Sequence, residues 1–556
     1  MDFAVALLLP IGIVFVFCCL FIMIGGIVSR DIFNEKGTSY RFSLCFFVGL
    51  ICFLAVLRTV ALIIRSYRFA FWLVLLAYIG WVAVNMIRKY RVSDVRMILV
   101  HYRKLIVSWL LLWFAHIFYQ LIIWFANLEQ TVLTPSTSVG SQHSIRYTNI
   151  AAYFTDYDYI PILNQSYGQS LLGSFGTFFG IDNINFFMSV WLAAGKTFMV
   201  LFLFGLFYKY FNRLLSILLT VVVFCGSVSL SAYPIKVLDT GSPFFYSGYT
   251  DSIVGACSFY IFLVFMFHIL SDKEKLTVKH YAFTFCMMLY WCMSAPQNIV
   301  VIGGIGFFIL LYLLWKKEFQ LVTPTLCIAG AVLVGAGVGI LEGGMLTPSS
   351  LIEDVNIEGI MTVAIKTGSV KISLVPSMPY FIDSDILQKW SYEIPYMENT
   401  LQYAVEGLNK GDIGICLYHL GILCWDSVRI IFWPLMGTLG MMWEVYKRRE
   451  RQIIYWSFAG VIALGIGWII AFVFSYCELK RELTRFMMPC YFLCMIFMAV
   501  LLGKLYERDK ICRCICICSM FMILCGQIPY RLIENIEVLQ TDQIAPLLKQ
   551  MITFVN

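Results

Sequence analysis

The chain has 556 residues, of which 60% are hydrophobic and only 13% are charged. Soluble proteins carry roughly a quarter charged residues, so this composition excludes an ordinary soluble domain and predicts a protein that crosses the membrane many times. The formal net charge of +7 is expected to reflect orientation in the membrane and gives no support for nucleic-acid binding.

Apolar runs of about 20 residues predict an all-α polytopic membrane protein with about 14 transmembrane helices and two large exoplasmic loops. The predicted spans are 4–28, 42–64, 69–87, 105–125, 184–207, 214–232, 252–270, 281–295, 299–315, 325–341, 412–441, 453–476, 486–503 and 511–528. The predicted parts of the chain are a four-helix segment 1–125, a first loop 126–183, core helices 184–341, a second loop 342–411, C-terminal helices 412–528 and an exoplasmic tail 529–556.

Basic residues in short connections give the orientation, because such connections stay in the cytoplasm. The connection after the third span holds six basic residues: Arg88, Lys89, Arg91, Arg96, Arg103 and Lys104. Alternation then places the basic segments 30–41, 209–213, 273–279, 316–317, 447–451 and 504–513 on the cytoplasmic side. Both large loops fall on the opposite, outer side.

The first loop contains the most polar and turn-rich stretch in the first half of the chain. Residues 142–172 read QHSIRYTNIAAYFTDYDYIPILNQSYGQSLL. Long connections are usually functional or disordered, and this one is too aromatic and apolar to be disordered. Its candidate site residues are His143, Arg146, Asp156, Asp158, Tyr167 and Gln169. We interpret the stretch as the roof or lining of an active site.

Three other outer segments carry charged side chains. One is the second loop, 342–411, whose Asp383 and Asp385 either serve a site or are simply solvated. The segment 233–251 contains Lys236, Asp239 and Asp251, the last of which either caps a helix or belongs to a site. The short connection 477–485 contains Arg481 and Arg485 on the side where the orientation rule disfavours basic residues. These arginines either anchor a helix end or bind phosphate, which matches the planar guanidinium group.

Three short segments resemble integral-membrane glycosyltransferases of the C type. They are IAAYFTDYDYIPILNQSYGQSLL in the first loop, SGYTDSI at 247–253 and LTRFMMPCYFL at 483–493, and they occur in the order found in that family. The resemblance implies transfer of a sugar from a polyprenyl-phosphate carrier to a glycan, lipid or protein acceptor at the outer face. We expect the protein to lie in a bacterial plasma membrane with its active site facing outward.

Such a reaction needs a carboxylate base for the acceptor hydroxyl and cations for the departing phosphate. Where the family carries an acidic residue early in the first loop, this chain has Ser141-Gln142-His143. The candidates for the base are Glu129, which lies in a poor sequence context, or Asp156 and Asp158, which we rank first because they lie in the stretch that resembles the family's catalytic loop. The predicted substrate-binding residues are His143, Arg146, Tyr167, Gln169, Lys236, Asp239, Asp251, Arg481 and Arg485.

Two other interpretations remain open at this stage. An O-antigen-type polysaccharide polymerase or ligase would also have many spans and a large late outer loop. A transporter or flippase would use ionisable groups within spans, such as His419, Asp426 and Arg429. No phosphate-binding loop, GxSxG or HExxH motif occurs, and we expect no cofactor, with a divalent metal as a minor alternative for Asp156-x-Asp158.

The topology is directly testable. With single cysteines introduced on a cysteine-depleted background, residues in 126–183 and 342–411 should react with an impermeant thiol reagent from outside the cell. Residues in 88–104 should react only after the membrane is permeabilised. Labelling of the two large loops from opposite sides would contradict the alternation.

Overall fold

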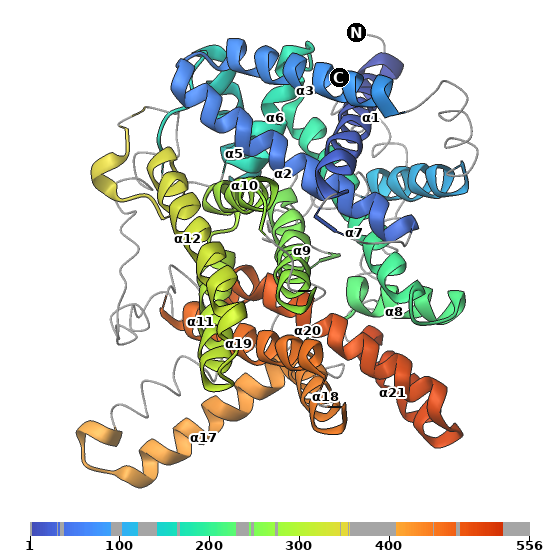
Figure 1. The fold of residues 1–556 in the computed structure, drawn as a ribbon, viewed down its shortest axis with the longest axis vertical. Helices are drawn as coiled ribbons and strands as arrows, with labels where there is room; N and C mark the ends of the chain where they lie inside the picture. The colour runs from blue at the N-terminus through green and yellow to red at the C-terminus, as the bar shows by residue number, and fades with distance from the viewer. Residues whose placement is uncertain are drawn as a thin grey trace, which may run out of the picture. The chain divides into compact units, whose positions relative to one another are not determined.

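The structure is a computed structural model that describes residues 3–30, 32–33, 38–89, 103–119, 142–163, 167–228, 244–245, 249–272, 276–344, 346–353, 355, 407–448, 450–473 and 479–525. Apart from one 3-10 turn, η1 (Ser349–Leu351), the regular elements within these ranges are α-helices (Figure 1). The first half contains α1 (Phe3–Ser29), α2 (Thr38–Ile64), α3 (Tyr67–Lys89), a helix over 103–119, α5 (Gln142–Asp156), α6 (Gly168–Phe178), α7 (Ile184–Tyr208), α8 (Arg213–Cys225) and α9 (Thr250–Asp272). The rest contains α10 (Val278–Ser294), α11 (Gln297–Trp315), α12 (Phe319–Glu342), α17 (Ile413–Ile430), α18 (Phe432–Arg448), α19 (Arg451–Val473), α20 (Leu479–Arg508) and α21 (Lys510–Cys525).

Eight helices in the described part of the chain are long and apolar enough to cross a membrane. Their apolar stretches are Leu7–Ser29, Ser39–Ile64, Tyr67–Arg88, Ile184–Tyr208, Thr250–Leu270, Gln297–Trp315, Phe319–Glu342 and Met487–Arg508. The helical membrane class predicted from composition is therefore confirmed. The count of fourteen spans stays a prediction.

The structure divides the predicted span 412–441 into two helices. α17 ends at Ile430 and α18 begins at Phe432. Pro434 lies in the first turn of α18, where its missing N–H is tolerated, whereas inside a longer helix its ring would clash with the carbonyl of Ile430. The break at Ile431 follows from that proline.

The chain forms two units: Met1–Tyr210, Tyr246–Ser369 and Ile533–Asn556 make the first, and Phe211–Phe245 and Val370–Leu532 make the second. In the first unit α1 packs along α2, and α7 also packs against α2. A Cβ atom on Gly25 would collide with the backbone of Cys45, and one on Gly49 with the backbone of Phe21. Small residues thus let α1 and α2 approach closely, as is typical of helix pairs in membranes.

The helix ends that the sequence assigns to the cytoplasm lie together in the first unit. The Lys209 ammonium, after α7, lies 3.9 Å from the ring centroid of Tyr40 in the first turn of α2. Phe33 contacts Phe265 of α9 and Phe283 of α10 edge to face, at centroid distances of 6.3 and 5.7 Å. The alternation of helix ends predicted from the basic loops is consistent with these contacts.

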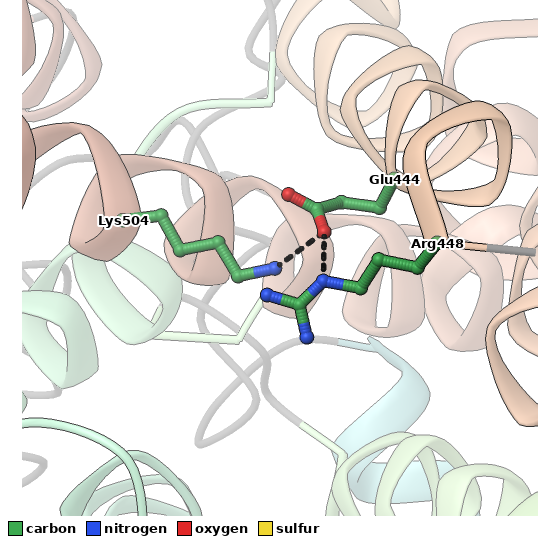
Figure 2. A network of polar contacts seen from close by, with 3 residues as sticks. All are labelled: Glu444, Arg448 and Lys504. Carbon is green, nitrogen blue, oxygen red and sulfur yellow. Dashed lines mark ion pairs between the residues drawn. The ribbon is translucent and has the colours of Figure 1, made fainter. Parts of the chain in front are cut away.

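In the second unit α20 packs against α8, α18, α19 and α21. Figure 2 shows one link between α18 and α20, in which Glu444 Oε2 lies 3.1 Å from Arg448 Nε and 3.2 Å from Lys504 Nζ. Two segments predicted to be cytoplasmic, 447–451 and 504–513, therefore lie at the same end of this unit. Because the cations are well exposed, the network contributes at most about 1 kcal/mol.

Candidate functional site

The predicted catalytic loop lines a hollow of about 570 Å³ in the first unit. Its walls come from the start of α3, the end of α5 and the segment that joins α6 to α7. The lining residues are Arg68, Trp72, Ala152, Thr155, Asp156, Thr177, Phe178, Gly180, Ile181, Asp182 and Ile184. A volume of this size lies within the range of small-molecule sites.

Asp156 is the last residue of α5, and its exposed side chain lines the hollow. Asp182, also exposed, lines it from the α6–α7 segment. Arg68 supplies the cation, and its Nη2 donates a hydrogen bond to the Thr155 carbonyl at 3.2 Å. The hollow thus combines two accessible carboxylates with one guanidinium, the groups needed to accept a proton and to hold an anion.

Asp158 lies two residues beyond Asp156 but has a different environment. One carboxylate oxygen accepts from the Ser66 hydroxyl at 2.7 Å and the other accepts from the Arg68 backbone N–H at 2.5 Å. The Asp158 carbonyl accepts from the Tyr67 N–H at 2.9 Å. Asp158 therefore caps the first turn of α3 from a distant part of the chain, and in doing so fixes the backbone that carries Arg68.

The stretch between Asp158 and α6 is built around Tyr167, which is fully buried. The Arg58 guanidinium carbon lies 4.2 Å from the Tyr167 ring centroid. The Tyr167 hydroxyl lies 3.0 Å from the Pro161 carbonyl oxygen and 2.9 Å from that of Leu163, and its backbone N–H donates to Met293. Burial raises the pKa of the Tyr167 phenol, so it stays a neutral hydrogen-bonding group.

Gln169 and Asp251, from two separate segments of the sequence, lie next to each other in the structure. The Gln169 backbone N–H, in the first turn of α6, donates to Asp251 Oδ2 at 3.1 Å. A Cβ atom on Gly168 would collide with the Asp251 carboxylate and the Ser294 hydroxyl, so glycine is required there. Asp251, only 5% exposed, thus stands at the N-termini of both α6 and α9.

The segment after α12 is hydrogen-bonded to the first loop. Gly344 N–H donates to the Leu163 carbonyl at 3.0 Å, and Glu353 N–H donates to the Ile162 carbonyl at 2.9 Å. The Glu353 carboxylate accepts from the Tyr159 hydroxyl at 2.6 and 2.8 Å. Burial and then this carboxylate raise the pKa of Tyr159 to about 12. We call residues 342–353 the strap.

The other predicted site residues lie, wholly or in their side chains, outside the part of the chain that the structure describes. Lys236 and Asp239 lie outside the described residues, as do Asp383 and Asp385. His143 and Arg146 belong to α5, and Arg481 and Arg485 belong to α20, but their side chains lie outside the described part of the structure. The same holds for His419, Asp426 and Arg429 of α17. Their roles stay predictions.

The sequence reading missed Arg58, Arg68, Trp72 and Asp182. Two of these four residues have a feature that is visible in the sequence. Arg58 is a charged residue inside a predicted span, and Arg68 is a basic residue on the predicted outer side. Within the described residues no group of three or more His, Cys, Asp or Glu side chains is arranged to hold a metal ion.

The comparisons with known proteins give no relative: no protein-family model, no curated protein and no solved structure matches the chain. The site is therefore argued from its own residues.

The cap formed by Asp158 gives a stability prediction. Asp158→Ala should lower the free energy of unfolding by about 1–2 kcal/mol, because it removes the cap of α3 and places alanine at a φ of +53°. Asp158→Asn should be close to wild type, since asparagine caps well and tolerates this backbone conformation. Thermal unfolding of the purified protein in one detergent measures both. Equal melting temperatures for the wild type and the alanine variant would contradict the capping role.

Proposed function

We propose that the protein is a membrane glycosyltransferase that moves a sugar from a polyprenyl-phosphate carrier to a cell-envelope glycan, lipid or protein acceptor on the exoplasmic face. The observation that carries the proposal is the hollow in which the accessible Asp156 carboxylate and the Arg68 guanidinium line a common space. Both stand in the first unit, at helix ends that the basic-loop pattern assigns to the outer side.

The arrangement of the helix ends supports the proposal further. The C-termini of α2, α10 and α12 and the N-termini of α3 and α9 all contact the loop 158–169 through Arg58, Ser294, Gly344, Tyr67 and Asp251. A lipid-linked donor presents its phosphate at the membrane surface, where such a ring of helix ends would lie. We expect the hollow to open at the level of the membrane surface where the donor phosphate would lie.

Asp156 and Arg68 have different roles in the proposed transfer step. Asp156 accepts the proton of the acceptor hydroxyl, whose oxygen attacks the anomeric carbon of the sugar. The bond between that carbon and the phosphate oxygen breaks, and the carrier phosphate leaves with the electron pair. Arg68 stabilises the negative charge that develops on the phosphate. A single displacement of this kind inverts the configuration at the anomeric carbon.

A polytopic transporter is the second candidate, and one observation favours it. Lys196 is 1% exposed within α7, beside a hydrogen bond of 2.9 Å between His116 Nδ1 and the Thr197 hydroxyl. Ionisable groups inside spans often mark transport routes. A transporter would not depend on Asp156, whereas the transferase would. The polymerase or ligase alternative shares the donor, and the length of the glycan product distinguishes it from a single-sugar transferase.

The first test removes the base. Asp156→Asn keeps the size of the side chain and should reduce sugar transfer by at least about 100-fold, because a positioned general base contributes that much or more. Transfer of radiolabelled sugar from its polyprenyl-phosphate carrier is measured in membranes of the native host, which supply the acceptor. Asp158→Asn is the matched control and should retain transfer. Wild-type rates for Asp156→Asn would refute the role of this carboxylate.

The second test concerns the phosphate contact. Arg68→Lys keeps the positive charge but loses the planar fork that binds two phosphate oxygens, so it should lower the transfer rate by about 10-fold. Arg68→Ala should lower it further. Arg213, an exposed arginine at the start of α8, gives the control variant Arg213→Lys, with no expected effect. Unchanged transfer by Arg68→Ala would show that Arg68 does not bind the carrier phosphate.

A further inference from the structure

We propose that the hollow holds the pyranose ring of the transferred sugar, with the Trp72 indole as its platform and the Asp182 carboxylate as the ligand of its hydroxyl groups. This inference deepens the proposed function and rests on it, because it assigns a part of the substrate to residues that the transfer step does not use.

Trp72 is the aromatic side chain that combines a place on the hollow with large exposure. It lies one turn after Arg68 on α3 and is 42% exposed. An aromatic face carries negative charge density, which attracts the weakly positive C–H groups on the apolar face of a sugar ring. A sugar presents an apolar C–H face and a rim of hydroxyl groups. The exposed indole can pack against the C–H face, and the two carboxylates and the guanidinium beside it can hydrogen-bond to the hydroxyl groups.

Three phenylalanine rings pack against the indole. Three neighbouring rings meet it edge to face: Phe71 at 5.2 Å, Phe179 at 5.9 Å and Phe178 at 6.4 Å between centroids. Aromatic pairs of this geometry are favourable and fix the ring orientation. The platform is therefore formed before a ligand arrives, and binding costs little side-chain entropy.

Asp182 is placed by the tight segment between α6 and α7. Gly180 has a φ of +73°, Gly180 N–H donates to Thr177 at 3.2 Å, and Ile181 N–H donates to Gly176 at 3.0 Å. The next residue, Asn183, uses its side chain to cap α7 at Phe186. The carboxylate of Asp182 has two oxygens that can accept from two neighbouring hydroxyl groups.

The other explanation of Trp72 is an ordinary residue of the aromatic belt at the membrane surface. A belt residue would anchor the helix at the membrane surface but would not contribute to sugar binding. Trp81 provides the comparison within the same helix, because it is 39% exposed and does not line the hollow.

The test measures sugar binding without turnover. Full-length protein in nanodiscs is mixed with methyl glycosides of common hexoses and N-acetylhexosamines, and saturation-transfer NMR reports binding. At least one glycoside should bind, and Trp72→Ala and Asp182→Asn should each weaken its binding about 10-fold. Trp72→Phe should retain most of the affinity, and Trp81→Ala all of it. Melting temperatures of each variant show that the fold is kept.

Each outcome bears on the proposal. Absence of binding by every glycoside, or equal losses in Trp72→Ala and Trp81→Ala, would overturn the sugar platform. Sugar binding that depends on Trp72, in a protein with no Asp156-dependent transfer, would keep the platform and refute the transferase. Transfer that depends on Asp156 but not on Trp72 would keep the transferase and refute the platform.

Discussion

The buried guanidinium of Arg58 against the ring of Tyr167 is the interaction on which the end of the first unit that carries the hollow depends. A charge in this position, 2% exposed within an apolar helix, is costly unless polar groups surround it. Here the Pro161 and Glu342 carbonyls accept hydrogen bonds from it and the Tyr167 face covers it. Pro161 and Tyr167 of the first loop and Glu342 at the end of α12 supply those partners, so the burial of Arg58 depends on the folded first loop and on α12.

From that contact, hydrogen bonds and the short stretch of chain between Asp158 and Pro161 lead to the hollow. Tyr167 holds the turn at Pro161 and Leu163, the chain before that turn carries Asp158, and Asp158 caps the helix that presents Arg68 and Trp72. Tyr167 itself does not line the hollow. A substitution at Arg58 would therefore act on the site from a distance, by releasing the backbone that orients its side chains.

How much of this was predictable differs between the fold and the site. Apolar runs predicted where the helices lie, because a span needs about 20 apolar residues whatever it packs against. The break before Phe432 was missed because the surrounding residues stay apolar, and only Pro434 marked it. Asp156 was predicted from its loop, but Asp182 was not, since it reaches the hollow only through the turn at Gly180. The different environments of Asp156 and Asp158 could not be predicted from a spacing of two residues. They arise from which carboxylate meets the start of α3.

The strap has a consequence for how this protein can diverge over evolution. Gly343 and Gly344, with φ values of +108° and +148°, let the chain turn sharply away from α12, and Glu353 fastens it ten residues later. The anchor therefore joins the start of the second loop to the first loop. We expect changes after Glu353 to be tolerated more readily than changes at the glycine pair or at the anchor, because the glycine pair and the anchor hold the first loop.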